Sequence, residues 1–174
     1  MVDRLFWPSW FVAAALAGIV TGFMLGHALI LVRLLDWMLA SATPGLLAQT
    51  YPAFREGVGR AGLDVYYVVG GLQVLSGLAF LVVALAARRH RGAAAIAAVC
   101  GAAWMVVRYA SGFAALEASV LGSTTEVTRE VRDRFLAWNA PIHFLHAATL
   151  AVALVALLSV PLSASRQSAS ADDS

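Results

Sequence analysis

The sequence predicts an all-α integral membrane protein, a four-helix bundle with amphipathic interfacial helices on its outer side. Of its 174 residues, 61% are hydrophobic and only 13% are charged, and the mean hydropathy is +0.80. A soluble domain carries about 25% charged residues. Four apolar runs each approach the roughly 20 residues that cross a bilayer, and they lie at about 10–33, 64–87, 92–115 and 140–162. We therefore expect one transmembrane domain over residues 1–162, in contact with the lipid bilayer.

The first apolar run is predicted to be a retained anchor and not a signal peptide. Ala15-Leu16-Ala17 resembles a cleavage site, yet the apolar run continues to Val32. This is longer than the apolar region of a signal peptide. At the other end of the chain, residues 163–174 are rich in Ser and Ala and acidic at the end, which predicts a disordered C-terminal tail.

A short basic turn between the second and third runs predicts the orientation in the membrane. Its sequence is Arg88-Arg89-His90-Arg91, and short basic loops remain cytoplasmic. Both termini are then cytoplasmic, and segments 34–63 and 116–139 lie outside. We expect a multi-pass protein of the cell (inner) membrane.

The two outer segments are predicted to contain interfacial helices. Residues 124–138 place charged side chains opposite an apolar stripe, and Ser123 and Glu126 have the spacing of a capping box. Glu130 and Arg134 are spaced to pair. The apolar stripe consists of Val127, Val131, Phe135 and Trp138. Asn139 and Pro141 then indicate a turn into the last span, and segment 36–60 indicates a second interfacial piece with a broken helix.

Charge and cysteine content exclude several classes of function. The net charge of +2 is too small to indicate a nucleic-acid partner. Cys100 is the single cysteine, so an internal disulfide, a CxxC redox pair and a cysteine-based metal site are excluded.

Three histidines in apolar runs are the main candidates for chemistry. A titratable side chain is costly at membrane depth and is usually functional there. His27 lies near the end of the first run and His143 and His146 near the start of the last, so antiparallel spans bring all three to one layer. Asn139, His143 and His146 share one helix face. The three histidines are candidate catalytic acid/base groups or ligands of a metal ion such as Zn, Cu or Fe. The alternative for His143 and His146 is interfacial hydration or bonding to backbone carbonyls.

Arg108 is the other costly residue. It lies about seven residues from the outer end of the third predicted span, or roughly 10 Å deep. Its fixed charge needs an anion or a route to the headgroups, and Glu117 and Asp64 are candidate partners. The functional alternative is a catalytic clamp for an anionic or carbonyl-bearing ligand, or for a haem propionate, with Trp104 one turn away to stack on it.

The remaining polar residues of the outer half complete a predicted pocket. Tyr67 and Gln73 lie on the second span, and we expect them to bind substrate together with Trp104 and Asn139. Polar groups at membrane depth must pair or line a cavity. In the first span, small residues at four-residue spacing predict close packing against another helix, which turns His27 toward the bundle. These residues are Gly18, Gly22 and Gly26.

Two short stretches resemble the anthrone-oxygenase-like family of small four-span membrane proteins. They are Thr21-Gly22-Phe23-Met24-Leu25-Gly26 and Arg134-Phe135-Leu136-Ala137-Trp138-Asn139. The chain departs from the family in having Phe113-Ala114-Ala115-Leu116-Glu117 where an Asn-Val-Pro-Leu-Asn-like stretch is expected, and in lacking a His-x-x-Arg-like element after Trp138-Asn139. The resemblance implies a four-span fold and, for some members, oxidation of anthrones to anthraquinones.

Three functions are compatible with these features. The first is a membrane oxidoreductase or oxygenase acting on an apolar aromatic or quinone-like small molecule; a variant binds haem b through His27 and His143 or His146, as an electron-transfer module. The second is a non-enzymatic accessory or assembly subunit of a larger membrane complex. The third is a transporter, which would require a homo-oligomer because four spans are few and the sequence has no inverted repeat.

Overall fold

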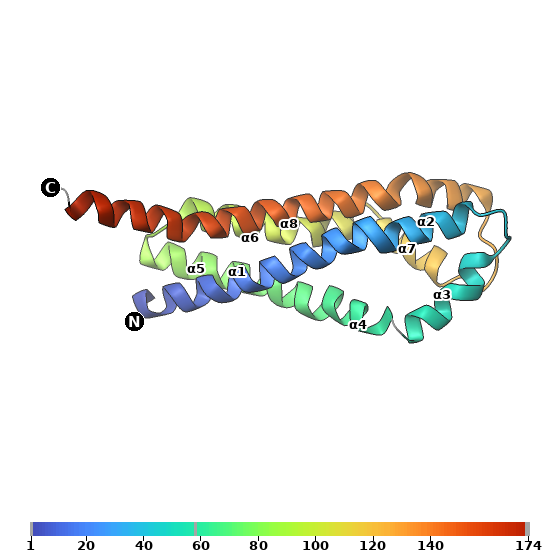
Figure 1. Cartoon of the computed structure of the whole chain (residues 1–174), viewed down its shortest axis with the longest axis horizontal. Coiled ribbons are helices and arrows are strands. Elements are labelled where there is room, and N and C mark those ends of the chain that lie inside the picture. Colours follow the sequence, from blue (N-terminus) through green and yellow to red (C-terminus); the bar gives the residue numbers. More distant parts are fainter. Residues whose placement is uncertain (1, 58, 173–174) are drawn as a thin grey trace.

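The computed structural model describes residues 2–57 and 59–172. All regular secondary structure in these residues is helical (Figure 1). No strand occurs within these residues. The elements in order are α1 (Val2–Gly26), η1 (His27–Leu31), α2 (Val32–Ala40), α3 (Leu46–Glu56), α4 (Gly59–Asp64), η2 (Val65–Val69), α5 (Gly70–Ala87), α6 (Arg91–Ala110), α7 (Phe113–Leu121) and α8 (Arg129–Asp172). Here α denotes an α-helix and η a π-helical turn.

The described residues contain four continuous helical stretches that are long and apolar enough to cross a membrane. They are Val2–Ala40, Gly59–Ala87, Arg91–Ala110 and Arg129–Ser163. Each contains most or all of one predicted span, so the predicted helical class is confirmed. The chain passes back and forth along the long axis, and both termini lie at the same end as the α5–α6 turn (Figure 1). α3 and α7 lie at the opposite end.

Small side chains allow the long helices to approach one another closely near the end of the molecule at which both termini lie. One apolar cluster there brings Phe6, Phe80 and Leu157 together with Ala13, Ala84 and Ala97. A second cluster, farther along the helices, is centred on Met24, Trp104 and Leu150. A third, between the ends of the helices and α3 and α7, includes Leu35, Phe113 and Phe135. α8 packs against both α6 and α1, and α1 also packs against α5.

The predicted interfacial helix at 124–138 is not a separate element. α8 begins at Arg129 and continues through Asn139 and Pro141 into the last apolar run. The charged first turns share a buried face with that run, since Phe135, Asn139 and Ile142 are all buried. Packing on this face holds the helix continuous where the sequence indicates a turn.

The start of α8 also differs from the predicted capping box. The Val131 amide donates to Thr128 Oγ1 over 3.4 Å, so Thr128 supplies the cap. Ser123 lies in the preceding turn, where its hydroxyl bonds the backbone of Thr125. The i,i+4 ion pair that forms is Arg129–Asp133, at 3.6 Å, in place of the predicted pair of Glu130 and Arg134.

The other outer segment is helical and broken, as its composition predicts. α2 ends at Ala40, and Gly45 with φ of +69° precedes α3. α3 ends at Glu56 and α4 begins at Gly59. This arm, α3 and α4, diverges from α1 and α2 in Figure 1.

The third and fourth long helices end at positions that the hydropathy pattern misplaces. α6 ends at Ala110 and not at residue 115, because Gly112 with φ of +75° separates it from α7. α8 remains helical to Asp172, across the segment for which composition predicts disorder. Extending an existing helix costs much less free energy than nucleating a new one. Residues 173 and 174 of that predicted tail lie outside the described residues.

Candidate functional site

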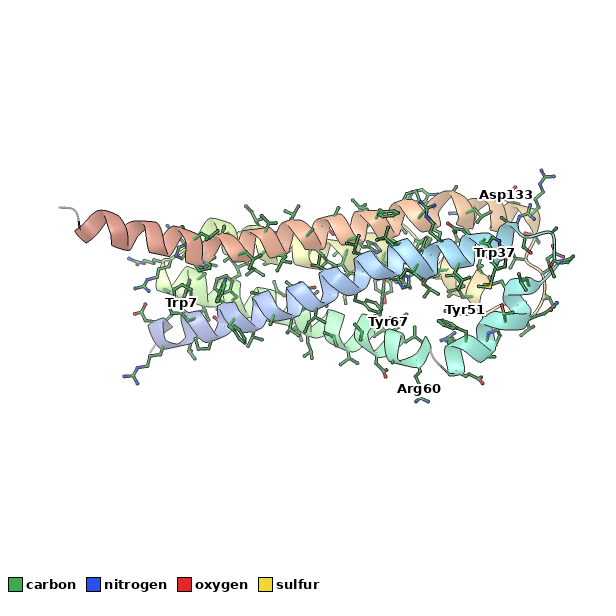
Figure 2. All side chains as sticks on the ribbon, viewed as in Figure 1. Trp7, Trp37, Tyr51, Arg60, Tyr67 and Asp133 are labelled. Atoms are coloured by element: carbon green, nitrogen blue, oxygen red, sulfur yellow. The ribbon has the colours of Figure 1, made fainter. Side chains whose placement is uncertain are left out.

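A cavity of about 680 Å³ lies between the α1–η1–α2 helix and the α3–α4 arm, with α6 and α7 behind it. This volume is in the range of small-molecule sites, about 300–1,000 Å³. Tyr51 and Tyr67 project into the space between these helices in Figure 2. The walls are largely apolar, and their polar members include His27, Tyr66, Tyr67, Arg108 and Glu117.

Two π-helical turns bring polar side chains to this cavity. His27 is the first residue of η1, and Tyr66 and Tyr67 belong to η2. A π-helical turn carries a wider backbone loop within a helix, and such turns occur frequently at functional sites. The rings of His27 and Tyr66 have their centres 6.5 Å apart. The two irregular turns therefore face each other across the same site.

The three histidines of the apolar runs lie in one layer. The ring centres of His27 and His143 are 4.8 Å apart, and those of His143 and His146 are 5.7 Å apart. His143 and His146 project from α8 and are 1% and 0% exposed. Only His27 lines the cavity. The layer therefore extends from the cavity wall into the core.

Three side chains of the cavity wall carry buried polar atoms that have no hydrogen-bond partner among the described residues. These atoms are Nε2 of His27, the hydroxyl of Tyr66, and Nε and Nη1 of Arg108. An unpaired buried polar group costs about 1–3 kcal/mol. Three of these atoms must donate, since guanidinium nitrogens carry only donors and a phenol carries one. These atoms are inaccessible to water in this structure, so they lie beneath the cavity surface, and a ligand oxygen reaches them only after a shift of the side chains.

Arg108 does not extend to headgroups but pairs with Glu117. It lies in the last turn of α6, closer to the helix end than predicted, and its Nη2 bonds the Glu117 carboxylate from α7. Both residues are buried. The guanidinium carbon also lies 4.8 Å from the Tyr66 ring centre, a cation–π contact. Of the two candidate partners, the structure selects Glu117, and Asp64 is exposed on α4.

Asn139 connects α8 to α2 and does not line the cavity. Its amide nitrogen donates to Asp36 Oδ1 over 2.8 Å and is 3.5 Å from the Val32 carbonyl. Its backbone carbonyl accepts from His143 Nδ1 over 2.8 Å. The sequence predicts that Asn139 binds substrate, and the structure places it away from the cavity wall, bonded to α2 and to His143.

Trp104 and Gln73 also belong to the core and not to the cavity wall. The Trp104 indole donates to Gln73 Oε1 over 3.2 Å, and both side chains are buried. Trp104 packs against His146 and Tyr66, with ring centres 6.0 and 5.2 Å away. Of the four residues predicted to bind substrate, only Tyr67 lines the cavity.

Two of the three glycines of α1, Gly22 and Gly26, line the cavity and do not mediate helix packing. A Cβ added to Gly22 or Gly26 would meet no atom within 4 Å, and both residues form part of the cavity wall. Gly18 alone approaches another helix, with a Leu154 carbon at 4.0 Å from the added Cβ. The predicted role in helix packing is therefore wrong for Gly22 and Gly26. Because they have no side chain, this part of the cavity wall is flat and the cavity stays open.

The histidine layer does not have the arrangement of a metal centre. Within residues 2–57 and 59–172, no group of three or more His, Cys, Asp or Glu side chains is placed to hold a metal ion. The arrangement also does not suit a haem held by His27 and His143. Two imidazoles on opposite sides of a metal have ring centres about 6 Å apart, given metal–nitrogen distances of about 2 Å. The rings of His27 and His143 are closer than that and leave no space for a macrocycle.

Tyr51 closes the cavity from the α3 side. It is buried, and burial together with the Glu117 carboxylate raises the pKa of its phenol above the ordinary value of 10.0. Its hydroxyl is therefore protonated at neutral pH and available as a further donor. Tyr51 is not identifiable as a cavity residue from sequence, because tyrosines near a membrane surface are common.

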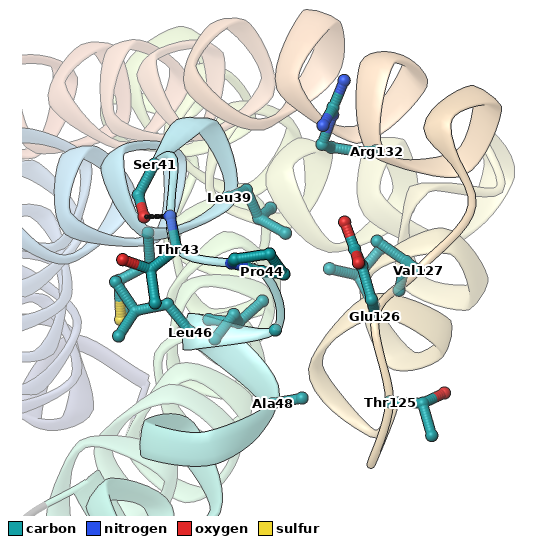
Figure 3. A pocket seen from close by; sticks show the side chains of 14 residues that line it. Leu39, Ser41, Thr43, Pro44, Leu46, Ala48, Thr125, Glu126, Val127 and Arg132 are labelled. Atoms are coloured by element: carbon teal, nitrogen blue, oxygen red, sulfur yellow. Dashed lines mark hydrogen bonds between the residues drawn. The ribbon is translucent and has the colours of Figure 1, made fainter.

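A second hollow, of about 40 Å³, lies between the loop preceding α3 and the segment preceding α8 (Figure 3). Ser41 Oγ accepts from the Thr43 amide there, over 3.0 Å. Its volume admits only water-sized occupants. The large cavity is therefore the candidate ligand site.

The chain matches no protein-family model, no curated protein and no solved structure.

Proposed function

We propose that this protein spans the cell membrane four times and binds an apolar small molecule bearing a carbonyl, phenolic or anionic oxygen. The observation that carries the proposal is the set of unpartnered atoms on His27, Tyr66 and Arg108 in an otherwise apolar wall. Small-molecule sites combine apolar walls with a few placed polar groups in this way. The ligand is held with its oxygen on the donors and its apolar body along α1.

An aromatic or quinone-like ligand fits this cavity best. Gly22 and Gly26 leave one wall flat, and aromatic rings of Tyr51 and Tyr67 line the opposite side. The resemblance to anthrone-oxygenase-like proteins favours the same class of ligand.

The chemistry supported by these groups is base-assisted oxidation of a phenol or carbon acid. Nε2 of His27 takes a proton from the substrate, and the electron pair of the broken bond remains on the substrate as a phenolate or enolate. Arg108 and Tyr66 donate hydrogen bonds to that oxygen, which is how preorganised donors stabilise developing charge. Dioxygen would be the oxidant: the anthrone CH2 carbon becomes a carbonyl carbon that takes one oxygen atom of dioxygen, and the other oxygen atom leaves as water with the two hydrogens.

The test is binding and turnover of anthrone by the purified protein in detergent. Anthrone quenching of tryptophan fluorescence measures binding, and anthraquinone absorbance measures oxidation under air. A Cβ added at Gly22 meets no atom within 4 Å, so Gly22→Leu should place its side chain in the cavity, and we expect at least a tenfold loss of affinity. Gly71→Leu is the matched control, because Gly71 also has nothing within 4 Å but lies off the cavity. Equal binding by both variants and the wild type would remove the cavity as the site.

A further inference from the structure

The cavity continues well beyond the flat part of its wall at Gly22 and Gly26. On the same helix it is also lined by Ile30 and Leu34. Gly22 and Leu34 are roughly 18 Å apart along the helix, at 1.5 Å per residue. Three fused rings are shorter than this, so a ligand such as anthrone leaves the wall at Ile30 and Leu34 uncovered.

This further part of the wall is apolar on the α1–η1–α2 side. Ile30, Leu34 and Leu35 line it there, and Phe54 lines it on the α3 side. Arg55 also lines this part, but it is exposed at the surface of α3. Ile30 and Leu34 are 72% and 42% exposed, so their apolar surface is left without protein contact. An apolar part of a ligand is the matching cover for such a wall.

The cavity is open at its side, between η1 and η2. Ile30 lies in η1 and Tyr67 in η2, and both line the cavity although they are 72% and 51% exposed. α4 packs mainly against α3 and η2, its neighbours along the chain, and the arm of α3 and α4 diverges from α1 and α2 (Figure 1). Ile30 and Tyr67 belong to helical stretches that are apolar enough to cross a membrane. In the proposed membrane location, this opening therefore leads into lipid.

We propose that the ligand of this cavity is a lipid with a phenolic or quinone ring and one long apolar chain, which enters sideways from the bilayer. The ring lies against Gly22 and Gly26. The chain passes over Ile30 and Leu34 and leaves between η1 and η2. This inference rests on the proposed function, and it narrows the ligand from free aromatic compounds to membrane lipids with an aromatic head.

The charges of the wall favour a neutral ring over a phospholipid head. Arg108 is paired with Glu117, so the ring end of the cavity has no excess positive charge for a phosphate. A chain also suits the opening better than a longer ring system does. A chain can bend from the wall into the bilayer, whereas a rigid ring system must lie wholly within the cavity.

The test compares a methoxylated benzoquinone with and without a decyl chain. The protein is placed in lipid nanodiscs, binding is measured by quenching of tryptophan fluorescence, and ligand concentration is expressed per volume of bilayer. The chain exchanges lipid contacts for equally apolar protein contacts. The two quinones should therefore bind with affinities within about threefold of each other, whereas a cavity closed at its side would exclude the decyl compound.

Two neighbouring residues of η1 provide a matched pair of variants. Ile30→Asn places an amide under the chain, so the affinity for the decyl quinone should fall about threefold to tenfold while that for the chainless quinone is unchanged. Leu29→Asn is the control, because Leu29 is 54% exposed but lies off the cavity. It should leave both affinities unchanged.

Photolabelling of the wild type serves if the variants do not fold. A decyl quinone with a diazirine at the chain end should label residues between Ile30 and Leu34 or Phe54, and excess decyl quinone should prevent this. Labelling at Gly22 instead, exclusion of the decyl quinone, or equal losses in the two variants overturns the proposal and leaves the proposed function intact. If neither quinone nor anthrone binds, the proposed function fails and this inference fails with it.

Discussion

The candidate site is defined at the residue scale by polar atoms without partners more than by the histidines themselves. Tyr66 shows this best, since its ring is packed by Arg108 and Trp104 while its buried hydroxyl has no partner. A group of this kind costs stability. Its retention is explained if a ligand completes the hydrogen bond, which is the stability–function trade-off common at binding sites.

Tyr66→Phe should therefore separate stability from binding. The variant removes an unpaired hydroxyl and keeps the ring contacts, so thermal unfolding in detergent should be unchanged or up to about 1 kcal/mol more favourable to the folded state. Affinity for anthrone, by fluorescence quenching, should fall about tenfold, equal to about 1.4 kcal/mol. Lower stability with unchanged affinity would show that the hydroxyl serves the fold and not the ligand.

The Arg108–Glu117 pair should show strong dependence of each partner on the other. Arg108→Met leaves a carboxylate buried without its cation, which costs about 3–5 kcal/mol. Combining Arg108→Met with Glu117→Leu removes both charges, and thermal unfolding should recover most of that loss. Neither the single nor the double variant should bind anthrone, because both lack the donors of Arg108. If the single variant unfolds like the wild type, Arg108 and Glu117 do not form a buried ion pair.

The free-energy cost of placing a titratable side chain in an apolar run identifies some of these residues from sequence and misses others. His27, His143 and Arg108 are identifiable from sequence because a titratable group in an apolar run is rare. Tyr66 is not, since tyrosine is ordinary near a membrane surface. Glu117 is identifiable from sequence only as a partner of Arg108, because its place near His143 depends on the break at Gly112 between α6 and α7.

At the scale of the elements, hydropathy predicts where helices lie but not how their faces are used. Gly22 and Gly26 have the spacing of a packing stripe, yet the neighbouring arm diverges and the stripe lines a cavity. The two π-helical turns leave no mark on the hydropathy pattern, because a wider turn within a helix changes no residue type. The predicted turn at Pro141 failed for a related reason: packing of the buried face outweighs the local signal.

Close helix packing occurs instead at the glycines of α5 and α6. A Cβ on Gly101 would lie 2.6 Å from Nε2 of Gln73, the residue that accepts from Trp104. Gly101→Ala should therefore destabilise the protein by about 1–3 kcal/mol in thermal unfolding. Gly71→Ala meets open space and should stabilise it by about 0.5–1 kcal/mol through helix propensity. Equal melting temperatures for the two variants would contradict the close approach of α5 and α6.

At the scale of the whole molecule, the path of the chain sets which groups share a membrane surface. Both termini and the α5–α6 turn lie at one end, and the cavity and the α3–α4 arm lie toward the other (Figure 1). The basic turn at 88–91 favours a cytoplasmic position for the first end. In the predicted orientation the cavity would lie in the outer half of the membrane, where a lipid-soluble compound would reach it without crossing the cytoplasm.

Single-cysteine labelling tests this orientation. In a Cys100→Ser background, Thr124→Cys places a thiol in the exposed loop before α8, and Arg89→Cys places one in the α5–α6 turn. A membrane-impermeant maleimide should label position 124 in intact cells and position 89 only after permeabilisation, because the two lie at opposite ends of the long helices. The reverse labelling pattern would show that the protein has the opposite orientation, with the cavity in the cytoplasmic half of the membrane. Labelling of both positions in intact cells would contradict a membrane-spanning arrangement altogether, since no bilayer would then separate the two ends.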